Sequence, residues 1–582
     1  MAVFERKVQL RSQLDDTDVL ACTVEASHNI QGHTEYSIRV QRGPHPGKCW
    51  HINKRFRDFV NLNSLLGMYG VSLPLPPKKF IGNMDPLFIA ERQIGLQNYL
   101  NVLQENPFLA TSFPVRQFLD PDHYPPSIHE NALHSVSLAL RGEPIWEVLK
   151  PLPELGWRIR KHYFLIKKHT PHQEDQELLL NWTEYGPDMN VQVSQLQSTL
   201  SVLSTLKEPV AVNIEFLRCN EIGCLVVRPF IEAGTLRDAL CGCKARVPVL
   251  RKYVSLKQYF PLAGDKIAAV ACQILQNLAV LHYKGIPYGQ LHTGNVCVSN
   301  RHVSLLDIEG GLLGVPSLYR PYVVQHRRLD TIQSVDMYSF GHVLYEMAFG
   351  SPLRKSSVET LPSSCCQSLA DVLEQLLSPR ALREGLPTAQ QLLQHEFFGR
   401  IDVAKILAEY RTFKFPGHTK EVLKSVTLKI EERLRHDQKI VHHQRRLAKV
   451  QEMLSSEEEK KRRKQKWKEK EKERQLQHKQ SQQQMVNGKS PERSDSPAST
   501  STATSAGTVT PPFGRSDSRL TSVTSSAPPP PVTPVPTPGS VPPPPPPPSA
   551  LPSPVVVPER AALLTSISAF NKSSLRQIKS PR

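Results

Sequence analysis

The segment from residue 286 to residue 346 constrains the fold of this chain more than any other. It reads IPYGQLHTGNVCVSNRHVSLLDIEGG and, after a short interval, SVDMYSFGHVLYEM. Short apolar runs alternate with single polar residues, among them Gln290, Asn295 and Asp307, and a helical pattern follows. This pattern predicts short strands followed by a helix.

In this register the segment resembles the core of protein kinases, in which H-R-D-x-x-x-x-N precedes two strands and D-F-G. Tyr288, Gly289 and Gln290 stand in place of His, Arg and Asp. The resemblance gives the replaced Asp the task of accepting the proton of the substrate hydroxyl, and an amide cannot act as that base. We therefore expect a kinase fold that no longer transfers phosphate.

The kinase resemblance covers residues 145–400, for which it implies two lobes. Asn295 and Asp307 match the two metal-binding positions, and Glu309 replaces the Gly of D-F-G with a charged side chain. A non-catalytic site for nucleotide and magnesium at Lys167, Asn295 and Asp307 is therefore the alternative to having no cofactor.

The place of the Gly-rich loop argues against that alternative. It reads KPLPELG, and its prolines lack the backbone N–H groups that wrap phosphates. The expected helix NVQVSQLQSTLSVLSTL contains no Glu that could pair with a nucleotide-binding lysine. Lys167 therefore fits an ordinary strand lysine better than a nucleotide ligand.

Residues 14–126 predict a small domain of strands followed by helices. Three of its segments, WHINKRFRDFVNL, LPLPPKKFIGN and FIAERQIGLQNYL, resemble the phosphoinositide-binding PX domain. An inositol phosphate needs cationic forks around its phosphates and a flat apolar surface beneath its ring. By its position in the motif, Arg55 would hold the 3-phosphate and Phe56 would stack under the ring. Lys78 would reach the 1-phosphate, and Arg92 would bind the ring hydroxyls.

The PX resemblance implies binding to phosphoinositide membranes, phosphatidylinositol 3-phosphate in particular. A few charge-assisted contacts of about 1.5 to 3 kcal/mol each predict only micromolar affinity for a headgroup. A second membrane contact is therefore expected, and the candidates for insertion are Phe80, Ile81 and Met84.

A net charge of +18 favours acidic surfaces, whether membrane or nucleic acid. Nucleic acid is not expected, because Trp467 is the only aromatic residue in the basic run. The apolar stretch from Ile267 is interrupted by polar residues and predicts a buried helix. The ten cysteines match no zinc spacing, so we expect no metal site, and so many cysteines without a signal favour reduced thiols in the cytoplasm. The PX resemblance implies peripheral association with endosomal or plasma membranes.

The C-terminal region predicts three segments. Residues 420–484 have the composition of a charged helix. Residues 485–558 are rich in Ser, Thr and Pro and are expected to be disordered. Their polyproline run, Pro528 to Pro548, suits the aromatic grooves of SH3 domains or profilin.

Residues 559–578 resemble a WH2 motif, in which an amphipathic helix and a following basic turn bind monomeric actin. The residues that carry this resemblance are Leu563, Leu564, Ile567 and Phe570 on one helical stripe, and then Leu575 and Arg576. Gln577 departs from the motif. An amphipathic tail helix that docks elsewhere is the alternative.

The fold class is therefore a multidomain α+β chain: a small mixed PX domain, a bilobal kinase-like domain, and a helical then disordered tail. This order resembles a family of PX-containing, kinase-like adaptors. The resemblance implies a modulator of the sodium pump, acting through its β subunits, and of membrane traffic. An active, atypical Ser/Thr kinase recruited to membranes by its PX domain is the alternative.

Overall fold

The computed structural model of the 582-residue chain describes residues 14–79, 84–169, 177–255, 258–299, 302–363, 365–411 and 413–486, with side chains up to 474. The chain divides into two compact units, Met1–Met485 and Val486–Arg582. The elements described below belong to the first unit, apart from the last residue of the final helix. The WH2-like segment, the polyproline run, Phe80 and Ile81 lie outside the described residues.

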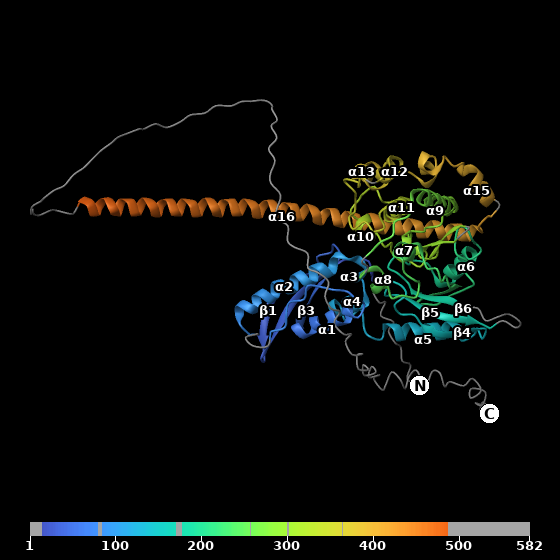
Figure 1. The fold of residues 1–582 in the computed structure, drawn as a ribbon, viewed down its shortest axis with the longest axis horizontal. Coiled ribbons are helices and arrows are strands. Elements are labelled where there is room, and N and C mark those ends of the chain that lie inside the picture. The colour runs from blue at the N-terminus through green and yellow to red at the C-terminus, as the bar shows by residue number, and fades with distance from the viewer. Residues whose placement is uncertain are drawn as a thin grey trace, which may run out of the picture. The chain divides into compact units, whose positions relative to one another are not determined.

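The N-terminal domain is a three-stranded antiparallel sheet in the order β1-β2-β3, covered by helices (Figure 1). Buried apolar residues alternate along β1 and β2, so one face of the sheet packs against the helices. The elements are β1 (Leu20–Ile30), β2 (His33–Arg42), β3 (Cys49–Arg55), α1 (Phe56–Gly67), α2 (Pro86–Glu105), α3 (Pro107–Ala110) and α4 (Phe113–Leu119).

The small lobe of the kinase-like domain is a five-stranded antiparallel sheet in the order β4-β5-β6-β8-β7. Helix α5 shares a buried apolar cluster with this sheet. The elements are α5 (Ile128–Leu140), β4 (Trp146–Pro151), β5 (Lys161–Lys168), β6 (Glu177–Glu184), α6 (Val193–Leu203), β7 (Phe216–Cys219) and β8 (Gly223–Pro229).

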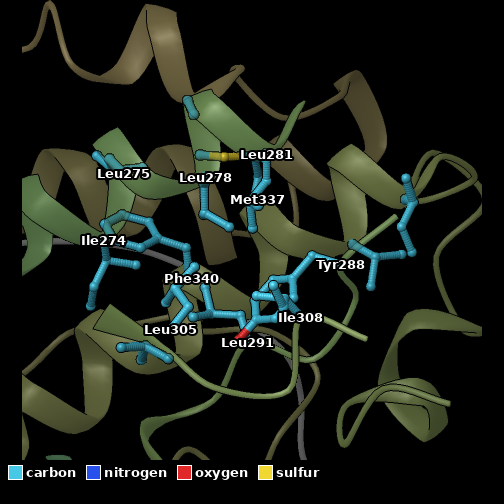
Figure 2. Packing of buried hydrophobic residues seen from close by; sticks show 14 of the residues in the cluster. Ile274, Leu275, Leu278, Leu281, Tyr288, Leu291, Leu305, Ile308, Met337 and Phe340 are labelled. Carbon is cyan, nitrogen blue, oxygen red and sulfur yellow. The ribbon is translucent and has the colours of Figure 1, made fainter. Parts of the chain in front are cut away.

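The large lobe is helical, and α9 and α11 each contribute several residues to its core, among them Leu278 and Phe340 (Figure 2). Helix α9 is the buried helix expected from Ile267 onward, and it ends at Gly285 in the left-handed conformation. The first elements of the lobe are α7 (Leu236–Leu240), α8 (Val249–Tyr253), α9 (Gly264–Lys284), η1 (Thr293–Asn295), β9 (Val296–Val298), β10 (Val303–Leu305) and α10 (Arg320–Val323).

The remaining elements complete the lobe and lead into one long helix. They are α11 (Ile332–Phe349), α12 (Gln367–Leu377), α13 (Ala381–Glu384), α14 (Ala389–Leu392), η2 (Glu396–Phe398), α15 (Val403–Arg411) and α16 (Gly417–Val486). The first part of α16 packs into the core of the large lobe, through Val422, Leu423, Val426, Ile430 and Leu434. Among the described residues, no helix is long and apolar enough to cross a membrane.

Candidate functional site: a basic pocket and a closed interlobe cleft

The basic residues predicted to bind a headgroup in the N-terminal domain lie where β3 passes into α1 and along α2. The guanidinium carbon of Arg92 lies 4.1 Å from the ring centroid of Phe56 and 4.3 Å from that of Phe88. Arg92 is only 7% exposed, and its Nη2 donates to the carbonyl of Pro77 at 3.4 Å. Its Nε has no hydrogen-bond partner among the described residues. The pocket thus holds a buried guanidinium that is not fully satisfied by protein acceptors.

Arg55 lies at the end of β3 and is exposed, with its Nε 3.3 Å from Oε1 of Glu35 on β2. Lys78 is exposed, and the adjacent Lys79 places its Nζ 4.3 Å from the ring centroid of Phe88. Met84 is half-buried. The structure therefore brings Phe56 and Arg92 into direct contact and places Arg55 at the C-terminal end of the strand that leads to Phe56.

The interlobe cleft of the kinase-like domain contains an ion pair between Lys161, at the start of β5, and Asp307. Burial alone would raise the pKa of Asp307, but Lys161 and Arg228 outweigh it and hold that pKa at about 2. Lys167 lies at the other end of β5, in register with Glu147 and Glu177. Lys161, and not Lys167, is therefore the lysine that reaches Asp307.

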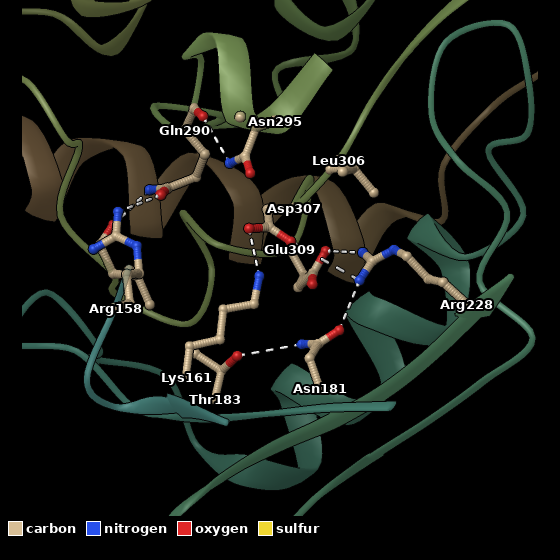
Figure 3. A network of polar contacts seen from close by, with 12 residues as sticks. Arg158, Lys161, Asn181, Thr183, Arg228, Gln290, Asn295, Leu306, Asp307 and Glu309 are labelled. Atoms are coloured by element: carbon tan, nitrogen blue, oxygen red, sulfur yellow. Dashed lines mark hydrogen bonds and ion pairs between the residues drawn. The ribbon is translucent and has the colours of Figure 1, made fainter. Parts of the chain in front are cut away.

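The negative charge of Glu309 is paired with the positive charge of Arg228 in a second buried ion pair. Nη2 of Arg228, at the end of β8, lies 2.5 Å from Oε2 of Glu309, and its Nη1 donates to Oδ1 of Asn181 at 3.1 Å (Figure 3). Both members of the pair are almost completely buried. The extra carboxylate that the sequence places after Asp307 is thus part of a stable polar network.

Gln290 is fixed by hydrogen bonds from both lobes. Arg158, in the segment between β4 and β5, donates from Nη2 to Oε1 of Gln290 at 2.9 Å (Figure 3). The Gln290 amide donates to the carbonyl of Val315 at 2.7 Å, and Asn295 donates to the Gln290 carbonyl at 2.9 Å. The side chain at the position of the catalytic base is therefore buried and engaged.

The cavity between the lobes has a volume of about 130 Å³. Its lining includes Lys161, Asn295 and Asp307, and also Phe108 from helix α3 of the N-terminal domain. The ring of Phe108 lies 6.3 Å from Trp157 and 5.5 Å from Tyr253, centroid to centroid. Sites for drug-sized ligands usually enclose about 300 to 1,000 Å³. The cleft in this structure is therefore too small for a nucleotide.

Helix α16 covers the outer face of the catalytic-loop region. Ile430 and Leu434 line a space of about 30 Å³ together with Gln290 and Tyr288. A substrate hydroxyl would have to approach residue 290 to react. The first part of α16 thus occupies space beside that position.

Polar contacts anchor α16 to both lobes. Nη1 of Arg433 lies 2.7 Å from Oδ1 of Asp188, which follows β6. Oδ2 of Asp437 lies 2.6 Å from Nη2 of Arg320 in α10. Nε2 of Gln438 donates to the carbonyls of His326 and Leu329, both at 2.9 Å. The helix is therefore an integral part of the kinase-like domain up to about this point.

Comparison with known protein families finds a PX domain over residues 42–122. The mouse (Mus musculus) PX domain-containing protein kinase-like protein is 43% identical over 451 residues, which cover 78% of this chain and 77% of that protein. These matches agree with a chain that combines a PX domain and a kinase-like domain.

Two further relatives match a smaller part of this chain. The Slowpoke-binding protein of Drosophila melanogaster is 30% identical over 38% of this chain and 45% of that protein. The Dictyostelium discoideum protein described as probable inactive serine/threonine-protein kinase slob1 is 26% identical over 44% of this chain and 48% of that protein. The chain thus spans less than half the length of these two relatives.

Proposed function

Since the chain belongs to the family of PX domain-containing protein kinase-like proteins, we propose that it is a phosphoinositide-binding adaptor whose kinase-like domain does not transfer phosphate. In this proposal the PX domain brings the chain to the membrane, and the kinase-like domain presents a rigid surface to other proteins. The proposed location is the cytoplasmic side of endosomal or plasma membranes.

The observation that carries the membrane part is the position of Arg92. Its guanidinium lies buried between two aromatic rings with one N–H unused, beside the exposed Arg55. The phosphates and hydroxyls of an inositol headgroup suit such groups. The test is flotation of the full chain with vesicles that contain phosphatidylinositol 3-phosphate. Vesicles of equal charge without that lipid should bind far less protein.

Three features support the proposal that the kinase-like domain does not transfer phosphate. Gln290 cannot accept a proton, and both its side-chain groups are already hydrogen bonded. The interlobe cavity is smaller than a nucleotide needs, and its Lys161 and Asp307 neutralise each other. Helix α16 lies where a substrate would approach. The alternative, an active atypical kinase, requires the cleft to open and another group to act as base.

Protein partners are proposed on the basis of relatives and of sequence. The Drosophila relative is named for binding Slowpoke, which supports a role for this chain in binding another protein. Modulation of the sodium pump through its β subunits, and capture of the polyproline run by SH3 domains or profilin, belong to the same proposal.

Actin binding through residues 559–578 is a separate part of the proposal and rests on the sequence alone. The stripe that ends at Phe570 would enter the actin cleft, and Leu575 with Arg576 would follow it. The test is pyrene-actin assembly with a peptide of this segment. Leu564→Asp combined with Ile567→Asp should abolish its effect, because two unpaired charges would enter an apolar cleft. A peptide that has no effect would refute actin binding.

A further inference from the structure

Helix α16 carries a second apolar stripe, which is exposed. Its residues are Leu447, Val450, Met453 and Leu454, and each side chain is between 47% and 61% exposed. The spacing of three and four residues places Leu447, Val450 and Leu454 on one face of the helix. A row of exposed apolar side chains along a helix suits the apolar face of a second helix.

The exposed stripe lies beyond the part of α16 that packs into the large lobe. The contacts with the lobe include the hydrogen bonds of Gln438, and the last buried apolar residue of the helix is Val441 among the side chains described. From residue 443 to residue 474 the side chains are largely exposed, although the helix continues without a break. The lobe therefore anchors a preformed helix, so a partner that binds the stripe does not have to order it first.

Charged residues at the two ends of the stripe have opposite signs. Arg446 lies four residues before Val450, and Glu457 lies three residues after Leu454, so both flank the stripe, and both are exposed. In an antiparallel pair of two copies, Arg446 of each copy would lie opposite Glu457 of the second copy. A parallel pair would set Glu457 against Glu457. The charges therefore favour the antiparallel arrangement of two identical helices.

We propose that residues 443–459 of α16 form a self-association surface, through which two copies of this chain pair as an antiparallel two-stranded coiled coil. The pair has two-fold symmetry, buries both stripes and forms the contact between Arg446 and Glu457 twice. The segment is about 25 Å long and holds only about two heptads, so we expect micromolar affinity. The proposal goes beyond the proposed function, since it depends neither on lipid binding nor on the loss of phosphate transfer.

Sedimentation velocity of the full chain, from about 1 to about 100 µM, tests the proposal. The mean mass of the parent chain should rise from that of a monomer towards that of a dimer. Leu447→Asp with Leu454→Asp should stay monomeric throughout, because the charges would enter an apolar interface. Leu428→Asp is the matched control, because Leu428 is 53% exposed on the same helix outside the stripe, and it should associate like the parent. Circular dichroism checks that each variant is folded.

Exchanging the two flanking charges tests the direction of pairing. Arg446→Glu and Glu457→Arg should each weaken the dimer about tenfold, because like charges then face each other at both ends. The variant that combines both substitutions should associate like the parent, and so should an equal mixture of the two single variants. Single substitutions without effect, or a combined variant as weak as the single ones, would overturn antiparallel pairing.

Two other outcomes would overturn self-association itself. One is a parent chain that stays monomeric at every concentration, and the other is a dimer that persists in Leu447→Asp with Leu454→Asp. If the parent were monomeric and this double variant lost binding to phosphoinositide vesicles, the stripe would be a membrane contact instead. Failure of the parent chain to bind such vesicles would refute the proposed function and leave self-association intact, so the two failures are distinguishable.

Discussion

Arg55 is the residue on which recruitment to membranes should depend most. The Arg55 guanidinium is half exposed and pairs with Glu35 on the neighbouring strand, so it is accessible to a ligand. Arg55→Ala should reduce binding to vesicles containing phosphatidylinositol 3-phosphate by about tenfold or more, because charge-assisted hydrogen bonds contribute about 1.5 to 3 kcal/mol. Vesicle co-sedimentation at moderate salt measures this effect.

Arg57 provides the matched control for that experiment. It is an exposed arginine in the first turn of α1, next to Phe56. Arg57→Ala removes the same charge and should change vesicle binding by less than about threefold, since a single surface charge contributes little. Equal losses in the two variants would mean that net charge, and not the pocket, controls recruitment.

The buried pair of Arg228 and Glu309 should control the stability of the kinase-like domain. Arg228→Met leaves Glu309 without its counter-charge and should cost about 3 to 5 kcal/mol of unfolding free energy. The double variant Arg228→Met with Glu309→Leu should recover most of that loss, because no unpaired charge remains. Urea unfolding of the two single variants and the double variant measures the coupling. Additive losses would show that the two side chains do not stabilise each other.

The low pKa of Asp307 should make the free energy of unfolding depend on pH. Its pKa falls from 3.8 to about 2 on folding, so its contribution to stability is fully present above about pH 4. That contribution, about 2 kcal/mol, should be lost as pH falls from 4 towards 2. The stability difference between the parent chain and Asp307→Asn should therefore shrink between pH 5 and pH 2.5 in urea unfolding. A constant difference would mean that Lys161 does not stabilise the ionised carboxylate.

The sequence analysis did not predict that the first part of helix α16 packs into the large lobe. Its composition predicts a charged, solvated helix, and from residue 443 to the last described side chain it is largely exposed. Its first part nevertheless carries a stripe spaced by three or four residues, Leu423, Val426, Ile430 and Leu434, which is buried in the large lobe. The spacing of these four residues indicates an apolar helical face that could pack against the lobe. The many charged residues around them lower the mean hydropathy of the segment, so its composition alone did not indicate burial.

Detaching α16 should expose the face beside Gln290. Ile430→Asp with Leu434→Asp places two charges in an apolar interface and should lower the unfolding free energy by several kcal/mol. Limited proteolysis should then cut near the start of α16. Leu428→Asp is the matched control on the same helix, since Leu428 is 53% exposed and should tolerate the charge. If the double variant and the control melted at the same temperature, the packing of α16 would not matter for stability.

Strand β5 shows why the sequence alone did not identify Lys161 as the partner of Asp307. Side chains on a strand alternate between its two faces, so Lys161 and Lys167 point to the same side. The alternation of side chains along a strand predicts which face a lysine lies on. It does not predict which lysine on that face lies next to Asp307. Asp307 and Gln290 were identified because the spacing of the loop fixes them. The partners of Glu309 and Gln290 come from distant segments, which local patterns do not connect.

At the scale of the whole molecule, the sequence predicted a PX domain and a kinase-like domain, and the PX family match together with the similarity to a PX domain-containing protein kinase-like protein confirms both. Motif spacing sufficed because each domain carries several short motifs in a fixed order. The aromatic contacts of Phe108 with Trp157 and Tyr253 at the interlobe cavity were not predicted, since they join three separate segments. Aromatic contacts between such segments leave no periodic signal in the sequence.

The central claim is that this chain binds membranes through its PX domain and uses its kinase fold without phosphate transfer. The most direct test is incorporation of labelled γ-phosphate from ATP and magnesium into the full chain and a generic protein substrate. We expect no incorporation above that of the Asp307→Ala variant, because Gln290 cannot act as base and Lys161 already pairs with Asp307. Incorporation by the parent chain that disappears in Asp307→Ala would contradict the account.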